Sequence, residues 1–285
     1  MDVAMARIEQ TRDLRVLASE QSAFVRALGV LGWGAVRSLP IVALAVAWEL
    51  FARSGAVTMF QLPPLSAVLE RIWNDVIAGN LFINTRLTLY RAITGFLVST
   101  VLGVGLGMAM SRSAIMRWFF DPIISVGFPM PKIAFLPIVM LWLGLYDVSK
   151  ISMVVFDAIF PVVTATVAGI AGIERELIWS ARNMGATDRE LMWQIVLPAA
   201  LPQIMTGLQV ALPIAMIVAV VAEMVMGGYG LGGAMMTSYR FADSRGVFAG
   251  IVEIAAVGYI LVKGMSLLRR RLLIWHPEAN EPSTV

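Results

Sequence analysis

The chain has 285 residues, of which 59% are hydrophobic and only 14% are charged, whereas soluble domains carry about 25% charged residues. This composition excludes a soluble globular protein and predicts an integral membrane protein. The net charge of +3 does not indicate a nucleic-acid partner, because the arginines stand at the ends of apolar segments and are not clustered with exposed aromatic residues. One histidine and no cysteine exclude most metal, disulfide and thiol chemistry, so we expect no metal site and no catalytic residues.

The N-terminal part is predicted to be an arm followed by a first span. Residues 1–37 mix arginines with acidic and apolar residues and lack the uninterrupted core of a signal peptide, so we expect a cytoplasmic arm. The apolar stretch from Leu39 to Phe51 predicts the first transmembrane span, with Glu49 paired to Arg53 at the membrane interface.

An interfacial helix and a second span are predicted next. Leu65 to Ile77 follows the turn Leu62-Pro63-Pro64 and alternates apolar and polar faces, so it is too short and too polar to span and should lie at the outer interface. Thr88 to Met110 predicts the second span. The run of Gly103, Gly105 and Gly107 in this span should let another helix approach closely.

Prolines interrupt the next apolar block, from Trp118 to Tyr146. Four prolines in this block make a straight helix unfavourable, so we predict a broken or kinked span. Such a break is tolerated in a membrane only where neighbouring protein or a water-lined path satisfies the freed backbone groups.

Three further spans complete a bundle of about six transmembrane helices over residues 38–271. They are Ile151 to Ile173, Ile204 to Met226 and Val247 to Leu268. The glycine-rich stretch from Gly227 to Arg245 is expected to be a flexible re-entrant segment or an external gate. Residues 272–285 then form a C-terminal tail. More basic residues fall on the N-terminal side of this topology, which predicts that both termini and the segment 174–202 are cytoplasmic.

The segment 174–202 holds the signals of two short helices. Leu177, Ala181 and Met184 recur with the spacing of one apolar helical stripe. Gly185 fits the helix C-terminal position at which the backbone turns left-handed. Thr187 and Glu190 have the spacing of a capping box.

The second helix should therefore start near Asp188. Leu191 and Ile195 would share its apolar face, and Pro198 and Pro202 should limit how it continues, because proline lacks a backbone donor. The pattern alone also allows an ordinary amphipathic loop between two spans.

Ionisable residues inside the predicted spans are candidate functional groups. Asp157, Glu223 and Glu253 each cost about 2.5–3.5 kcal/mol on insertion scales, so each needs a partner or a cavity. For Asp157 and Glu253 structural pairing is the favoured interpretation. For Glu223 a functional and a structural role remain equally open.

The chain has no GxxxxGK(S/T) phosphate loop, so it cannot hydrolyse ATP by that route. The only histidine, His276, is isolated beyond the last span, and no catalytic arrangement is evident. Three classes remain open. They are a transport subunit driven by a separate ATPase, a proton-coupled secondary transporter using Asp157, Glu223 and Glu253, and an integral-membrane enzyme.

Several stretches resemble a known family. Ser180-Ala181-Arg182, Gly185-Ala186, Val196 to Pro202 and Gly207-Leu208 resemble the cytoplasmic EAA loop of binding-protein-dependent ABC transporter permeases. Trp179 stands where the general EAA pattern has glutamate. Other stretches are similar to the nitrate/sulfonate/taurine/bicarbonate branch: Leu62-Pro63-Pro64, Leu87 to Arg91 with Gly95-Phe96, Pro129 to Lys132 with Leu136-Pro137, Leu141 to Gly144, Ala222-Glu223-Met224 and Gly230-Leu231-Gly232.

The resemblance implies an all-α type I ABC importer permease in the bacterial inner membrane, with a cytoplasmic coupling helix pair. It also implies three partners: a second permease copy, most simply in a homodimer, a cytoplasmic ATPase dimer that binds ATP and Mg, and an extracytoplasmic solute-binding protein. The permease itself would hold no cofactor. Contact with the ATPase is then expected from Trp179, Ala181, Arg182, Met184, Gly185, Ala186, Leu191, Ile195, Leu197 and Pro198.

The candidate pathway residues are Pro131, Lys132, Asp157, Glu223 and Met224. The branch carries small oxyanions, sulfonates and related small nutrients. The methionine-rich spans lack a ring of arginines, which favours an organic anion over nitrate.

Overall fold

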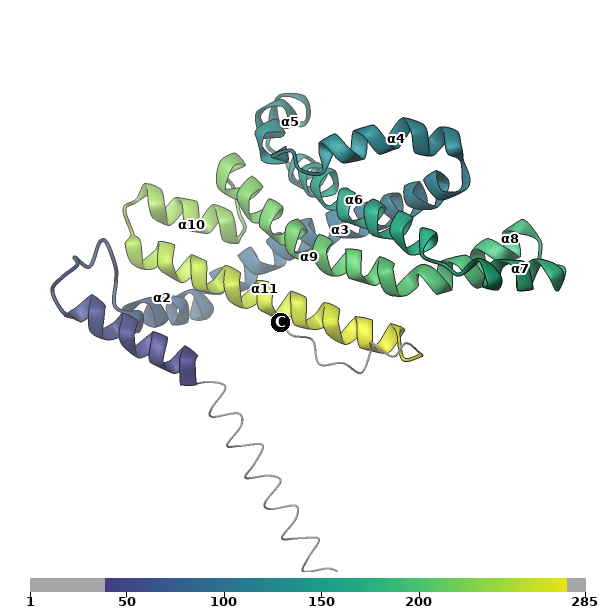
Figure 1. Ribbon diagram of the computed structural model, residues 1–285. Helices are drawn as coiled ribbons and strands as arrows, with labels where there is room; N and C mark the ends of the chain where they lie inside the picture. The colour runs from purple at the N-terminus through teal and green to yellow at the C-terminus, as the bar shows by residue number, and fades with distance from the viewer. Residues whose placement is uncertain (1–38, 276–285) are drawn as a thin grey trace, which may run out of the picture. The chain divides into compact units, whose positions relative to one another are not determined.

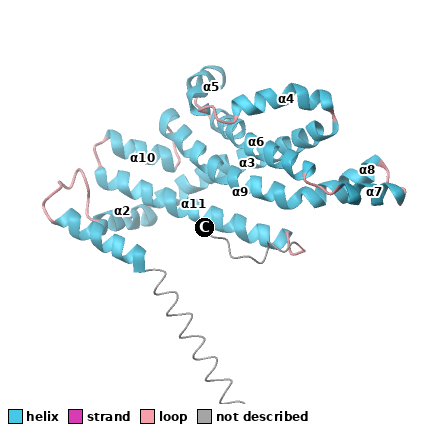
Figure 2. Ribbon diagram, in the orientation of Figure 1, coloured by secondary structure: helices cyan, strands magenta, loops and turns pink. Residues whose placement is uncertain are grey.

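The computed structural model describes residues 39–275, and every regular element within them is helical (Figures 1 and 2). The all-α prediction is therefore confirmed for this range. The predicted arm over residues 1–37, His276 and most of the tail over 272–285 lie outside the described residues. Residues 39–67 belong to one compact unit and residues 68–275 to a second.

The first unit contains a helix over residues 39–53, which covers the predicted first span. The predicted ion pair is present, with 2.6 Å between Arg53 Nε and Glu49 Oε1. Glu49 also accepts hydrogen bonds from the backbone N–H and the hydroxyl of Ser66. Trp48 Nε1 donates to the carbonyl of Pro63 at 3.0 Å. These bonds tie the intervening turn back to the helix that precedes it.

The remaining elements follow in a short order of helices. They are α2 (Leu65–Ile77), α3 (Asn80–Arg112), α4 (Ala114–Gly127), a 3-10 turn (Lys132–Phe135), α5 (Leu136–Leu143), α6 (Asp147–Ala171), α7 (Arg175–Asn183), α8 (Asp188–Glu190), a π-helical segment (Leu191–Val196), α9 (Leu197–Met226), α10 (Leu231–Arg240) and α11 (Ser244–Leu272). The bounds of α2 are those predicted from the alternating pattern.

Within the described residues, four helical stretches are long and apolar enough to cross a membrane. They are Asn80–Arg112, Asp147–Ala171, Asp188–Arg240 and Ser244–Leu272. The stretches Ala114–Gly127 and Lys132–Leu143 would make a fifth span that is bent by 95°. The proline-rich block is therefore broken, as predicted. The second span begins earlier than expected, because the helix extends from Thr88 back to Asn80.

Two other expectations need correction. The stretch from Gly227 to Arg245 is not a flexible loop throughout, because it contains α10. Pro198 and Pro202 do not end the coupling-loop helix, since the chain continues through both into α9. A proline takes away the backbone donor of an i→i−4 bond, and the π-helical segment just before Pro198 is where the chain departs from α-helical bonding.

The core of the second unit lies where α6 packs against both α3 and α9. The inward face of α9 is made of small residues, with Ala211, Ala215 and Ala219 fully buried at four-residue intervals. Their spacing places them on one side of the helix. Short side chains on that face let α6 approach closely, as in other membrane helix pairs.

Glycines let α3 lie against α6. A Cβ built on Gly103 would lie 2.8 Å from Val162, and one built on Gly107 would lie 2.6 Å from Thr166. Gly95 meets Val154 in the same way. Gly105 does not belong to this contact, because a Cβ there would meet nothing within 4 Å. The predicted close approach is confirmed for Gly103 and Gly107 and was wrong for Gly105, which points to a different side of the helix.

Replacing Gly103 by leucine should therefore lower stability, whereas the same change at Gly105 should not. Overpacking a filled contact costs about 1–3 kcal/mol. The thermal unfolding midpoint of the purified chain in detergent would show the difference. Equal midpoints for Gly103→Leu and Gly105→Leu would contradict the assigned packing face.

Candidate functional site

The turn between α7 and α8 is built around Gly185. Its φ is +87°, in the left-handed region. The N–H of Ala186 donates to the carbonyl of Ala181 at 3.1 Å, and the N–H of Gly185 donates to the carbonyl of Arg182 at 3.0 Å. These two bonds form a Schellman motif, which satisfies the last carbonyls of a helix. The predicted role of Gly185 as a helix terminator is confirmed.

The start of the next helix has the predicted capping box. The N–H of Glu190 donates to Thr187 Oγ1 at 3.3 Å, and the N–H of Thr187 donates to Glu190 Oε2 at 2.9 Å. Each side chain thus satisfies a backbone donor that the helix cannot satisfy itself. With Gly185 on one side and Thr187 on the other, the turn between the helices has a defined geometry.

The apolar residues of this segment face two ways. Ala181, Leu191 and Val196 are buried and form a small core with Ile195 and Ala186 packed against it. The predicted single stripe of Leu177, Ala181 and Met184 is therefore split, because only Ala181 is turned inward. Arg182 and Pro198 are exposed and Leu197 is half-buried.

The opposite face leaves large apolar side chains in the open. Met184 is 86% exposed, and Trp179 and Trp193 are 58% and 57% exposed. Trp193 was not among the predicted contact residues. It lies two residues from Leu191 and so on a different side of the helix, which the apolar pattern alone could not assign. Exposed aromatic and methionine side chains on one short segment are typical of a surface that binds another protein.

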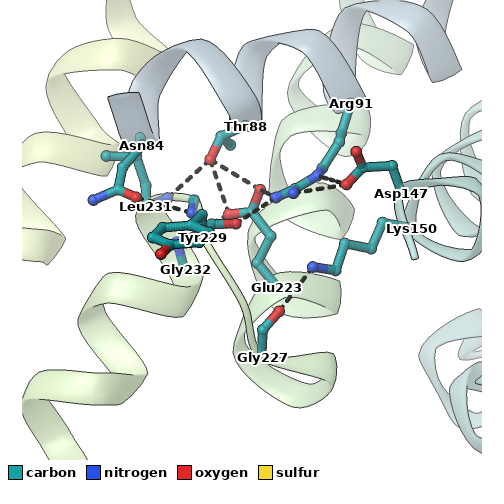
Figure 3. Close-up of polar contacts among 11 residues, drawn as sticks. Asn84, Thr88, Arg91, Asp147, Lys150, Glu223, Gly227, Tyr229, Leu231 and Gly232 are labelled. Atoms are coloured by element: carbon teal, nitrogen blue, oxygen red, sulfur yellow. Dashed lines mark hydrogen bonds and ion pairs between the residues drawn. The ribbon is translucent and has the colours of Figure 1, made fainter. Parts of the chain in front are cut away.

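A second cluster surrounds Glu223, the fully buried carboxylate near the end of α9 (Figure 3). Arg91 Nη1 of α3 donates to Glu223 Oε1 at 2.5 Å. Thr88 Oγ1 lies 2.8 Å from Glu223 Oε2, and the backbone N–H of Gly232 donates to the same oxygen at 3.1 Å. Both carboxylate oxygens therefore have partners. This satisfies the requirement that a buried charge be paired and hydrogen-bonded.

The same cluster holds the glycine-rich segment before α10 in place. Arg91 Nη1 also donates to the carbonyl of Tyr229 at 2.6 Å, and its Nε donates to Asp147 Oδ1 at 2.8 Å. Lys150 Nζ donates to the carbonyl of Gly227 at 2.7 Å. Side chains of α3 and α6 thus anchor a turn that follows α9.

Gly230 shows how close this turn comes to the cluster. Its φ is +130°, and a Cβ at this position would collide with the carboxylate of Glu223. The N–H of Gly230 donates to Asn84 Oδ1 at 3.0 Å, and the N–H of Leu231 donates to Thr88 Oγ1 at 2.9 Å. The glycine is therefore required both by its backbone conformation and by the space available.

A third polar contact lies at the break after α4. Lys132 Nζ lies 2.9 Å from Asp157 Oδ1 of α6, and it donates to the carbonyl of Phe128 at 3.1 Å. The ring of Phe160 is centred 4.6 Å from the same ammonium. Asp157 is therefore paired within the bundle. Of the other candidate pathway residues, Pro131 is exposed and Met224 is half-buried.

Sequence reasoning missed Arg91 and Thr88 as members of the Glu223 cluster. Arg91 was counted among the residues that set the topology. It is instead the twelfth residue of α3, and only 4% of it is exposed. A basic residue inside a helix long enough to span a membrane was the available signal. No three His, Asp or Glu side chains among the described residues are placed to share a metal ion.

Residues 99–273 match the family described as binding-protein-dependent transport system inner membrane component. The chain belongs to this family. It is 31% identical to the taurine transport system permease protein TauC of Escherichia coli (strain K12), over 84% of this chain and 89% of that protein. It is 33% identical to the putative aliphatic sulfonates transport permease protein SsuC of Bacillus subtilis (strain 168), over 86% of this chain and 88% of that protein.

Solved structures support the fold of this permease. A chain of the inward-facing MetNI methionine ABC transporter superposes with a TM-score of 0.59 at 16% identity, covering 70% of this chain and 98% of that one. A chain of an amino acid ABC transporter, solved with histidines, gives a TM-score of 0.57 at 20% identity, with the same coverage. The permease thus has the fold of an ABC importer permease.

The chain is therefore a multi-pass inner-membrane permease subunit of an ABC importer, and it is a non-catalytic subunit. An importer of this kind works with an ATPase and a solute-binding protein. The comparisons give no support to a proton-coupled secondary transporter or to an integral-membrane enzyme.

Proposed function

We propose that this permease imports a small organic sulfonate or a related organic anion. Two of its relatives are named as permeases for taurine and for aliphatic sulfonates, and they align over most of its length. The apolar, methionine-rich spans fit an organic solute better than nitrate or bicarbonate. The solute-binding protein would make most of the selection.

We also propose that the segment from α7 through the π-helical turn is the contact with a separate ATPase that binds ATP and Mg. The observation that carries this proposal is the exposed apolar face of Trp179, Met184 and Trp193 on a turn of defined geometry. Ala181, Leu191 and Ile195 would transmit movement inward, because they pack against the end of α6. Arg182, Ala186, Leu197 and Pro198 complete the proposed coupling segment.

The proposed assembly contains two copies of this chain and two ATPase subunits. Both termini, and with them the arm over 1–37 and the tail over 272–285, would be cytoplasmic, on the same side as the coupling segment. The pathway would run past Pro131, Lys132, Asp157 and Met224. Glu223 would contribute through its network, because its carboxylate is fully buried.

Reconstitution of the permease with its ATPase and solute-binding protein in vesicles tests this function. We expect uptake of a labelled alkanesulfonate that requires ATP and is unaffected by an uncoupler. Trp179→Ala should lower uptake several-fold with normal insertion, because it removes an anchor of the ATPase contact. Trp73→Ala, on α2 and 64% exposed, is the matched control. Uptake without the ATPase, or equal uptake by both variants, would contradict the proposal.

A further inference from the structure

A polar cavity of about 440 Å³ lies between α2, α3, α10 and α11, within residues 68–275. The segment Gly228 to Tyr229 forms part of its wall. The cavity follows the far end of α9, which at 30 residues separates it from the coupling segment by about 45 Å. Its polar lining includes the side chains of Asp75, Asn80, Asn84, Thr237, Ser238 and Glu253.

Glu253 is the unusual member of this lining. Only 9% of the residue is exposed, and its Oε1 is buried without a hydrogen-bond partner among the described residues. A buried carboxylate is normally paired with a cation or coordinates one, because desolvation of an unpaired charge is costly. Glu223, by contrast, is equally buried but has partners on both oxygens.

The basic residue at this cavity does not neutralise Glu253. Arg71 Nε lies 3.0 Å from Asp75 Oδ2, and its Nη1 lies 2.6 Å from Asp243 Oδ2. Two carboxylates thus already balance this guanidinium. Glu253 adds a further negative charge, so the cavity attracts a cation.

The other lining groups also fit a cation. Carboxylate, amide and hydroxyl oxygens are the ligands that hard cations prefer, and they accept hydrogen bonds from an ammonium group equally well. Asn84 Oδ1 accepts the N–H of Gly230 but has a second lone pair available. A volume of about 440 Å³ admits a hydrated ion or a small organic amine.

We propose that this cavity binds a compact cation, either an alkali metal ion or the primary ammonium group of a small molecule, at the carboxylate of Glu253. The site is separate from the proposed sulfonate transport and does not depend on it. The wall segment Gly228 to Tyr229 is also held by Arg91 and Lys150. A bound cation would therefore stabilise the turn between α9 and α10.

Calorimetric titration of the full-length permease in lipid nanodiscs tests the site. In a choline buffer, sodium chloride, potassium chloride and ethylammonium chloride are the probes, and choline ethanesulfonate is the anion control. We expect saturable binding of at least one cation and no binding of the sulfonate. Glu253→Gln should weaken cation binding at least tenfold. Asp121→Asn, which alters an exposed carboxylate paired with Arg117 on α4, should leave it unchanged.

A second variant supplies the cation within the protein. The side chain of Met235 lies against Gly250, one helical turn before Glu253, since a Cβ on Gly250 would lie 3.0 Å from Met235 Cβ. Met235→Lys should place an ammonium in the cavity and abolish binding while the chain stays folded. This variant decides the question if Glu253→Gln fails to fold.

The outcomes separate the two sources of the cation. Binding of sodium or potassium alone identifies an inorganic ion, and binding of ethylammonium alone identifies an amine; either result, or both together, supports the site. The proposal is overturned if no cation binds the unmodified protein saturably, or if binding is unchanged in Glu253→Gln and Met235→Lys.

Discussion

Replacing Gly185 by valine is expected to reduce ATP-driven uptake at least tenfold, while the chain still inserts into the membrane. The residue has a φ of +87°, which costs a residue with a side chain about 1–2 kcal/mol and a β-branched residue more. Packing is not the cause, because a Cβ at Gly185 would meet nothing within 4 Å. The strain would change the angle between α7 and α8, and with it the orientation of Trp179 and Met184.

Gly185→Asn is the matched control for this experiment. Asparagine adds a side chain of similar volume but tolerates the left-handed backbone. We expect it to retain most of the uptake and most of the stimulation of the ATPase. The two rates, measured in reconstituted vesicles, separate backbone strain from the mere presence of a side chain. Wild-type uptake by the valine variant would show that the turn geometry does not matter for coupling.

Arg91→Ala is expected to destabilise the permease by about 3–5 kcal/mol, because removing one partner of a buried ion pair leaves the other charge uncompensated. Glu223 is fully buried and would keep only Thr88 and the N–H of Gly232 as partners. The carbonyl of Tyr229 and Asp147 would lose their contacts with the guanidinium as well. The turn before α10 should then become susceptible to proteolysis.

Thermal unfolding of the purified chain measures this effect. Arg86→Ala, on the same helix but exposed, is the control and should change the midpoint little. Adding Glu223→Gln to Arg91→Ala should recover part of the lost stability, because the remaining buried group is then uncharged. If the double variant is no more stable than Arg91→Ala, the uncompensated charge of Glu223 is not the source of the loss.

Local signals were sufficient for the coupling segment. A left-handed glycine and a capping box depend on residues within a few positions of each other, so Gly185, Thr187 and Glu190 could be assigned from the sequence. The same holds for the break in the proline-rich block and for the bounds of α2. The apolar stripe through Ala181 was harder, because the face that is buried depends on where α6 ends.

Contacts between distant residues were beyond the sequence. Arg91 meets Glu223 across 132 positions, and Gly230 meets Asn84 across 146. Nothing in a single sequence relates such positions. Lys132 and Asp157 could be nominated as intramembrane charges, but only the 95° bend of the chain shows how they meet.

By itself, the sequence determined that this is a helical membrane protein with a capped helix pair between two spans, because composition, periodicity and capping are short-range properties of the chain. The tertiary structure decided which charges are neutralised. It gave Glu223 a partner for each oxygen and left Glu253 facing a cavity with an unpartnered oxygen. The physical reason is that pairing of a buried charge depends on which helices pack together, and that packing brings together residues far apart in the chain.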